Sequence, residues 1–226
     1  ALKKRLNEIY SKHSEKSVKD NFHSRVSFIP NPIPSVFAKH KTKEDYGTNE
    51  DFEILFVGRI TELKGVKVLL EAMSRLESVK LTLVGSIDQK MESWIASYAK
   101  RHSIQLEIIS EVRRDNLVKF YDSADLFVLP SFTEGFPNVL LEAASTCTPI
   151  VATDVGNARD IFSYESDTYN QLVSPGDSDE LCDAIVAVRN NYSYYVAQSI
   201  LFREVLMKKY SEKIVYESLV NLWNKI

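Results

Sequence analysis

The chain has 226 residues, of which 44% are hydrophobic, and its formal net charge is −3. This size and apolar content allow one large domain with a substantial core, with room for a short piece of a second domain. Basic and acidic residues are interspersed, which argues against a nucleic-acid partner or a strongly anionic membrane partner, and no apolar run approaches the roughly 18 to 20 residues of a spanning helix.

The chain begins inside an amphipathic pattern, because Leu2, Leu6, Ile9 and Tyr10 have helical spacing. No methionine precedes Ala1. We therefore expect a fragment or a processed chain.

A proline-rich stretch follows, VSFIPNPIPSVF, with Pro30, Pro32 and Pro34. Proline restricts its own backbone and pushes the preceding residue toward extended geometry. We therefore expect residues 30–48 to form a linker and no helix.

From Glu53 onward, short apolar runs alternate with helical patterns. Strands are predicted at 53–58, 79–85, 104–109, 125–130 and 149–154, with a weaker one at 169–173. Helices are predicted at 65–77, 88–102, 114–123, 137–146, 156–163, 178–191, 193–207 and 211–225. Tight hairpins cannot join parallel neighbours, so this alternation predicts an α/β fold with a doubly wound parallel sheet and C-terminal helices.

The loop after the first predicted strand carries two cations next to glycines, in Gly58-Arg59 and Lys64-Gly65. In open parallel sheets, ligands bind beyond the carboxyl ends of the strands, where loops lead into helix N-termini. Fixed positive charge and free N–H groups at such a place suit a diphosphate. A solvated turn with a glycine at the helix start explains the same residues, and this short pattern alone leaves both interpretations open.

The fourth predicted strand leads to two carboxylates, Glu134 and Glu142, on one side of a helix start. Pro137 predicts that start, and Gly135 allows backbone to approach a ligand closely. A carboxylate can accept hydrogen bonds from both hydroxyls of a sugar diol. An acidic first turn that complements the helix dipole explains Glu134 equally well, but it explains Glu142, which has apolar neighbours, less well.

Four elements in this order resemble the retaining GT-B glycosyltransferases often called family 4: Gly58-Arg59, Lys64-Gly65, the stretch EGFPNVLLE at 134–142 and the stretch TPIVATDVG at 148–156. The resemblance covers nearly all of residues 29–226. It implies the C-terminal half of a GT-B fold, a Rossmann-like domain that binds a nucleoside-diphosphate sugar. The enzyme would transfer the sugar to a hydroxyl acceptor with retention of configuration, in cell-surface polysaccharide or glycolipid synthesis.

The resemblance also implies roles for individual residues. Arg59 and Lys64 would bind the diphosphate and stabilise the charge on the leaving group, with no metal or other cofactor. Glu134 would contact the transferred sugar, and Glu142 would accept the ribose hydroxyls. The other implied binding residues are Gly58, Ser86 at a phosphate or the base, Glu111 and Val112 at the base, and Gly135, Phe136, Pro137 and Asn138 around the sugar.

The chain departs from the family pattern at three positions. Cys147 stands where glycine is common, and Asn157 and Asp160 stand where glycine and glutamate are common. These departures concern the geometry of loops near the sugar. We expect Cys147 to be a small buried residue and not a nucleophile, because nothing basic adjoins it in sequence.

The resemblance divides the chain into three parts. Residues 1–28 would be the tail of an acceptor-binding domain and its connector, residues 29–210 the donor-binding domain, and residues 211–226 a helix that reaches back toward the missing domain. An acceptor glycan or lipid-linked sugar would bind that missing domain. We therefore expect the chain alone to bind a nucleoside diphosphate weakly and to be inactive in transfer. Its composition fits a cytoplasmic protein, with peripheral contact at the inner membrane face compatible.

Two other functions remain open from the sequence. A sugar-nucleotide epimerase would share the architecture, although no acid and base pair for elimination stands beside Glu134. A nucleotide-binding module without turnover is the second.

Overall fold

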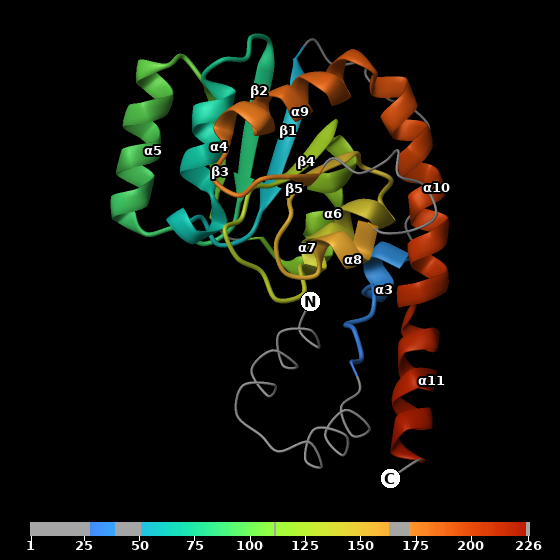
Figure 1. Cartoon of the computed structure of the whole chain (residues 1–226). Helices are drawn as coiled ribbons and strands as arrows, with labels where there is room; N and C mark the ends of the chain where they lie inside the picture. Colours follow the sequence, from blue (N-terminus) through green and yellow to red (C-terminus); the bar gives the residue numbers. More distant parts are fainter. Residues whose placement is uncertain (1–27, 39–50, 111, 163–171, 225–226) are drawn as a thin grey trace, which may run out of the picture.

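A computed structural model of the chain describes residues 28–38, 51–110, 112–162 and 172–224. Its centre is a six-stranded parallel sheet in the order β3-β2-β1-β4-β5-β6 (Figure 1). The strands are β1 (Phe52–Val57), β2 (Val79–Val84), β3 (Gln105–Ile109), β4 (Leu126–Leu129), β5 (Ile150–Thr153) and β6 (Leu172–Val173). The strand order reverses at β1 and β4, so the predicted doubly wound, Rossmann-like α/β fold is confirmed.

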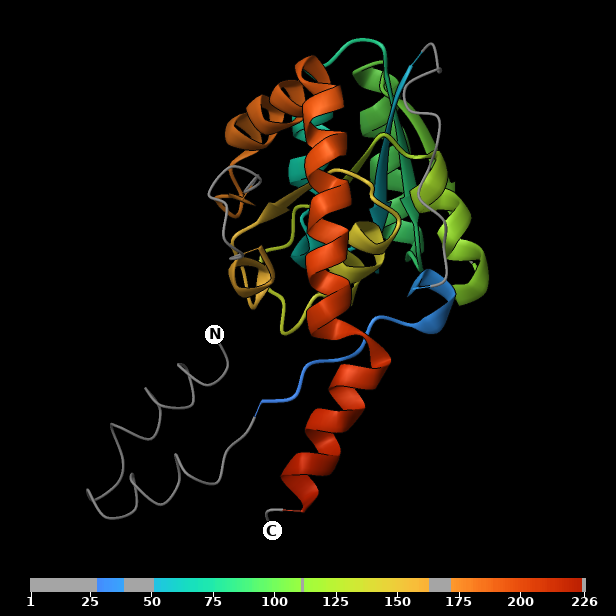
Figure 2. The same cartoon turned by 90° about the vertical axis from the view of Figure 1, so that its right-hand side faces the viewer.

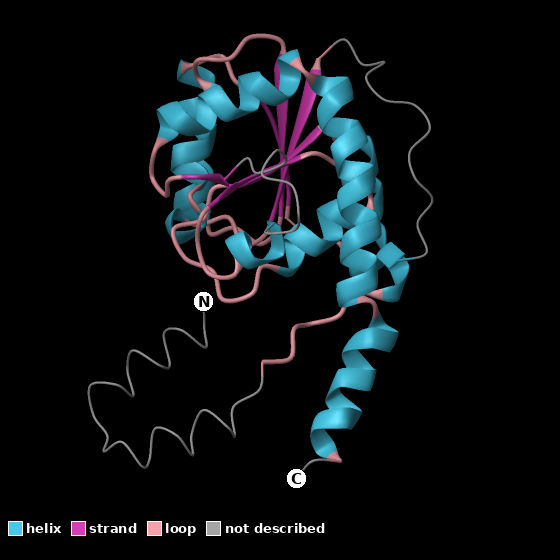
Figure 3. Cartoon of the chain, turned by 45° about the vertical axis from the view of Figure 1, so that its right-hand side comes forward, coloured by secondary structure: helices cyan, strands magenta, loops and turns pink. Residues whose placement is uncertain are grey.

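Helices cover both faces of the sheet, as Figure 3 shows. The helices of the described residues are α3 (Ser35–Ala38), the 3-10 turn η1 (Glu62–Lys64), α4 (Val66–Met73), α5 (Gln89–Arg101), α6 (Arg114–Ser123), α7 (Asn138–Ser145), α8 (Ala158–Phe162), α9 (Ser178–Asn190), α10 (Tyr192–Tyr210) and α11 (Glu212–Trp223). Helix α4 packs against α5 and α9, whereas α7 packs against α3, α6 and α10. These two groups are the layers that right-handed crossovers place on opposite faces.

The burial of the strands follows from their place in the sheet. Every residue of β4 and β5 is buried, because helices cover these central strands on both faces. The edge strand β3 instead exposes Gln105 and Glu107. Polar side chains at an edge discourage pairing with another chain.

The part of the predicted linker that the structure describes is docked on the domain. The expectation that it holds no helix is wrong for Ser35–Ala38, which form the single turn α3. Pro34 precedes this turn, where proline costs no hydrogen bond, and its carbonyl accepts hydrogen bonds from the N–H groups of Phe37 and Ala38 at 2.9 and 3.0 Å. Ile33 and Phe37 are fully buried. Residues 39–48 of the predicted linker lie outside the described residues.

The last two helices differ in how they meet the domain. Helix α10 lies along the body, and α11 extends beyond it (Figure 2). The N–H of Ile33 donates to the carbonyl of Tyr210 at 2.8 Å, which joins the end of α10 to the docked part of the linker. Helix α11 exposes large apolar side chains at Ile214, Tyr216, Leu219, Val220 and Trp223.

Cys147 occupies a backbone position that favours glycine, with φ at 59° just after α7. Its N–H donates to the carbonyl of Ala144 at 3.1 Å, and the N–H of Thr148 donates to that of Ala143 at 3.1 Å. This pair of hydrogen bonds is typical of a helix C-terminus, where the residue at the position of Cys147 is usually glycine. Burial raises the pKa of the Cys147 thiol to about 11, which keeps it protonated at neutral pH. The expectation of a buried, unreactive residue is confirmed.

Gly65 lets two strand-end loops meet backbone to backbone. It has φ at 70°, and a Cβ built on it would lie 1.8 Å from the carbonyl oxygen of Pro130. No side chain fits there. The turn after β1 therefore rests directly on the end of β4.

We expect Gly65→Ala to lower the free energy of unfolding by about 2 kcal/mol or more, because a left-handed backbone and a backbone clash act together. Urea unfolding measures the loss. Gly135→Ala is the matched control, since apart from the adjacent residues nothing in the described structure lies within 4 Å of a Cβ at that position. Its effect should stay within about 0.5 kcal/mol. Equal losses for the two variants would contradict the role of the Gly65 contact.

Candidate active site

A cavity of about 530 Å³ opens at the carboxyl ends of β1, β2 and β3. It is lined by Val57, Gly58, Val84, Gly85, Ser86, Ser110, Val112, Arg113 and Leu117. Three of the predicted binding residues, Gly58, Ser86 and Val112, are therefore brought together. Glu111 lies outside the described residues. The volume and the mixed polar and apolar lining are typical of a small-molecule site.

Sequence reasoning missed Arg113 in this cavity, although a signal was present. Arg113 and Arg114 stand at the N-terminus of α6, where positive charge opposes the helix dipole. Two cations at such a place do not stabilise the helix. This mismatch indicates contacts outside the helix.

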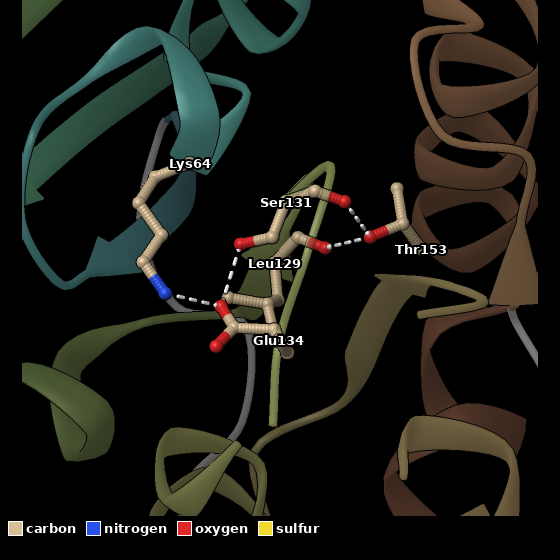
Figure 4. A network of polar contacts seen from close by, with 5 residues as sticks. All are labelled: Lys64, Leu129, Ser131, Glu134 and Thr153. Carbon is tan, nitrogen blue, oxygen red and sulfur yellow. Dashed lines mark hydrogen bonds and ion pairs between the residues drawn. The ribbon is translucent and has the colours of Figure 1, made fainter. Parts of the chain in front are cut away.

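A second group of predicted residues meets where η1 approaches the loop between β4 and α7. The N–H of Phe132 donates to the carbonyl of Leu63 at 3.0 Å and holds the two loops together. Lys64 Nζ then donates to Glu134 Oε1 at 2.6 Å (Figure 4). The two side chains are only 22% and 11% exposed, so water screens this ion pair poorly. The structure thus joins two of the three residues predicted to be catalytic.

Arg59, the third, lies two residues after the end of β1 and is exposed. Within the described part of the chain its guanidinium makes no hydrogen bond or ion pair. A charge without a partner at the end of a central strand is available to an anionic ligand.

Two buried hydroxyl residues support Glu134, and sequence reasoning missed both. Ser131 Oγ donates to Glu134 Oε1 at 2.7 Å, and Thr153 Oγ1 donates to the carbonyl of Ser131 at 2.6 Å (Figure 4). The position of Ser131, three residues before the carboxylate, was a usable signal, because serine forms such local bonds in turns. Nothing in the sequence indicated Thr153, which comes from the neighbouring strand β5.

Glu142 lies inside α7 and is only 4% exposed. Tyr121 Oη donates to its Oε2 at 3.1 Å, and Arg114 Nη2 donates to its Oε1 at 3.3 Å. Burial raises the pKa of the Glu142 carboxyl, and the two hydrogen bonds and the charge of Arg114 only partly oppose this. Burial, with the adjacent Glu142, also raises the pKa of Tyr121 well above its ordinary value.

The two carboxylates that the sequence placed side by side have separate partners. Glu134 bonds to residues of η1 and the strand-end loop, whereas Glu142 bonds to residues of α6. Arg114 and Tyr121 are seven residues apart, so they share one face of α6. That spacing was visible in the sequence.

Of the residues expected around the sugar, Phe136 and Asn138 contact aromatic and polar side chains from other parts of the chain. Phe136 packs against Phe28 and Tyr210, with ring centroids 5.9 Å apart in each pair. Asn138 Oδ1 accepts a hydrogen bond from Asn31 Nδ2 at 3.1 Å. Phe136 and Asn138 therefore contact residues 28–31 at the start of the docked segment, and Pro137 between them is buried.

The backbone of Gly135 meets the loop after β5. Its carbonyl accepts a hydrogen bond from the N–H of Asn157 at 3.2 Å. A Cβ on Gly156 would lie 2.3 Å from the carbonyl oxygen of Glu134, so these loops also touch through their backbones. Asn157 contributes through its backbone N–H, a group that every residue except proline has. Asp160 lies in α8 and is exposed.

In the described ranges, no three His, Cys, Asp or Glu side chains gather in a way that could hold a metal ion. No helix in those ranges has the length and apolar character needed to cross a bilayer.

Comparisons with known proteins agree with this geometry. The family model described as "Glycosyl transferases group 1" matches residues 51–191. The chain is 30% identical to an uncharacterized glycosyltransferase, MJ1607, of Methanocaldococcus jannaschii, in an alignment that covers 80% of this chain and 47% of that protein. It is 27% identical to the capsular polysaccharide biosynthesis glycosyltransferase CapM of Staphylococcus aureus, over 82% of this chain and 50% of that protein.

A solved structure shows the same fold. Anabaena Alr3699/HepE in complex with UDP and glucose superposes with a TM-score of 0.71 at 18% identity, over 78% of this chain and 49% of that one. The chain thus spans about half the length of the relatives it matches. Because the family model covers most of the chain, including both strand-end loops of the site, the protein belongs to the group 1 glycosyl transferases.

Proposed function

We propose that this chain is the donor-binding half of a retaining glycosyltransferase of family 4. It would transfer a sugar from a nucleoside-diphosphate sugar to a hydroxyl acceptor. The observation that carries this proposal is the shielded pair of Lys64 and Glu134, which lies at the carboxyl ends of the strands, where the cavity also opens. Arg59, whose guanidinium has no partner among the described residues, lies at the same end of the sheet. Family membership supports the reaction class.

In this proposal, Lys64 and Arg59 neutralise the diphosphate as it leaves. Negative charge develops on the leaving group in the transition state, and fixed cations that await it lower the barrier. Lys64 would exchange Glu134 for the phosphate, which frees the Glu134 carboxylate to accept hydroxyl groups of the sugar. No metal or other cofactor is needed for this step.

The ribose and the base would occupy the cavity side of the site. Glu142 would accept the ribose hydroxyls, with one of them replacing Arg114 at Oε1, where the present hydrogen bond is long at 3.3 Å. Ser86 and Val112 line the space proposed for the base, and Gly58 the space beside the phosphates. A structural role for Glu142 as a buried partner of Tyr121 is the competing interpretation.

The remaining half of the enzyme would supply the acceptor site. We propose that residues 29–210 form the donor domain, that residues 1–28 end the acceptor domain, and that α11 within 211–226 reaches toward that domain. The exposed apolar side chains of α11 support this division. The likeness to CapM, a capsular polysaccharide biosynthesis glycosyltransferase, supports a role in polysaccharide synthesis. We propose that the acceptor is a glycan or a lipid-linked sugar and that the enzyme acts at the cytoplasmic side of a membrane.

A sugar-nucleotide epimerase is the competing enzyme. Release of nucleoside diphosphate only when an acceptor is present favours transfer, whereas interconversion of sugar nucleotides without an acceptor would rule it out. In this proposal the isolated chain should bind nucleotide without turnover, because the acceptor half of the catalytic cleft would lie outside it.

We expect Lys64→Ala and Arg59→Ala each to weaken binding of a nucleoside diphosphate by about tenfold or more, since each removes a charged donor. Titration calorimetry with UDP, GDP and ADP measures this and identifies the base. Lys100→Ala, an exposed lysine in the last turn of α5, is the control and should leave binding unchanged. Absence of binding by the unchanged chain, or unaltered binding by both variants, would remove the diphosphate site.

The ribose role of Glu142 predicts a selective loss. Glu142→Ala should weaken UDP more than 2′-deoxy-UDP, or the corresponding pair for whichever base the chain prefers, because only the ribonucleotide offers two hydroxyls to the carboxylate. The same calorimetry gives both affinities. Equal losses for the two nucleotides would assign Glu142 to structure alone.

The raised pKa of Glu142 predicts that this site costs stability at neutral pH. A carboxyl whose folded pKa is raised favours folding below its unfolded pKa and loses that contribution as pH rises through the folded pKa. The melting temperature of Glu142→Gln, relative to that of the unchanged chain, should therefore be higher at pH 8 than at pH 5. A relative melting temperature that does not rise with pH would contradict this.

A further inference from the structure

We propose that Ser131 and Thr153 are positioning residues for Glu134. They hold one of its carboxylate oxygens so that the other faces the donor sugar. This inference rests on the proposed function. Ser131 is fully buried and Thr153 is 2% exposed, so neither belongs to the surface that a ligand would touch first. Both act through Glu134, which Figure 4 shows between Lys64 and Ser131.

The hydrogen bonds divide the two carboxylate oxygens of Glu134. Lys64 Nζ and Ser131 Oγ both donate to Oε1, at 2.6 and 2.7 Å. No described residue donates to Oε2. One oxygen is therefore held by two donors, and the other remains to accept a hydroxyl group of the sugar.

Thr153 holds the backbone from which this arrangement starts. Its single hydroxyl proton has two carbonyls in reach, that of Ser131 at 2.6 Å and that of Leu129 at 3.2 Å, and it serves the nearer one. The paired register of β4 and β5 ends at Leu129 and Ala152. The Thr153 side chain thus ties β5 to the chain beyond the last strand pair, where Ser131 begins the loop.

Lys64 and Ser131, which both donate hydrogen bonds to Oε1 of Glu134, would behave differently once a sugar nucleotide binds. Lys64 is a mobile cation that a diphosphate would attract away from Glu134. Ser131 has one proton and is fixed in a buried turn, so it would keep Glu134 oriented after Lys64 leaves. Because the Glu134 carboxylate is oriented before the ligand arrives, less of the binding free energy is lost in ordering it.

A comparison of affinities for UDP-glucose and UDP, and for GDP-mannose and GDP, tests this role. We expect Ser131→Ala to lower the affinity for the sugar nucleotide by about five- to tenfold relative to the free nucleotide, because the hydrogen bond to a charged acceptor is lost. Thr153→Val, which keeps the shape without the hydroxyl, should shift the same ratio less. Thr153→Ser should restore it.

Two further variants separate positioning from folding and from the proposed function. Ser145→Ala removes another buried serine hydroxyl, which donates to the carbonyl of Leu141, and should leave the ratio unchanged. Glu134→Ala should shift the ratio at least as much as Ser131→Ala. A shift with Glu134→Ala but none with Ser131→Ala would overturn the positioning role alone.

Other outcomes are equally decisive. Equal losses of sugar nucleotide and free nucleotide in Ser131→Ala, in step with a lower melting temperature, would make the serine merely structural. A ratio that Glu134→Ala leaves unchanged would overturn the inference as well. An unchanged chain that binds none of the four ligands would overturn the proposed function and this inference with it.

Discussion

The contact between Gly65 and the carbonyl of Pro130 is the constraint on which the site depends. It brings the turn after β1 onto the end of β4 at a distance that only glycine permits. Lys64 precedes that glycine, and Glu134 follows that proline by four residues. The ion pair between them is thus a consequence of backbone packing at the switch point of the sheet, where neighbouring crossovers leave to opposite faces.

Around this contact the domain accepts features that do not favour its own stability. Glu142 is a carboxylate buried in a helix, where burial opposes its charge. Arg113 and Arg114 stand at a helix N-terminus, where the dipole is unfavourable to cations. Such local conflicts are expected where side chains serve a ligand more than the fold. Their grouping at one sheet edge agrees with a single site.

Local pattern predicted much of this structure and failed where distant segments meet. The apolar runs located the first five strands, and α6 begins and ends as predicted. Both follow from the spacing of apolar residues along the sequence, which reflects which side chains are buried. The prolines predicted a linker without a helix, yet Ser35–Ala38 form α3, which packs against α6 and α7, and Ile33 and Phe37 are fully buried. Ser131 was detectable beside Glu134, whereas Thr153 became a partner only through the pairing of β4 with β5.

The sequence by itself determined the α/β class, the strand ends where folds of this class bind ligands, and the residue types that suit a diphosphate and a sugar. These follow from period, turn residues and charge, which are local properties. Tertiary structure alone decided that Lys64 bonds to Glu134 and that Glu142 bonds instead to Tyr121 and Arg114. It also decided that, among the described residues, both donors to Glu134 meet the same carboxylate oxygen. The reason is that such pairings depend on the distances between side chains on different loops. Those distances follow from how the loops at the strand ends pack together, and the order of residues along the chain does not specify them.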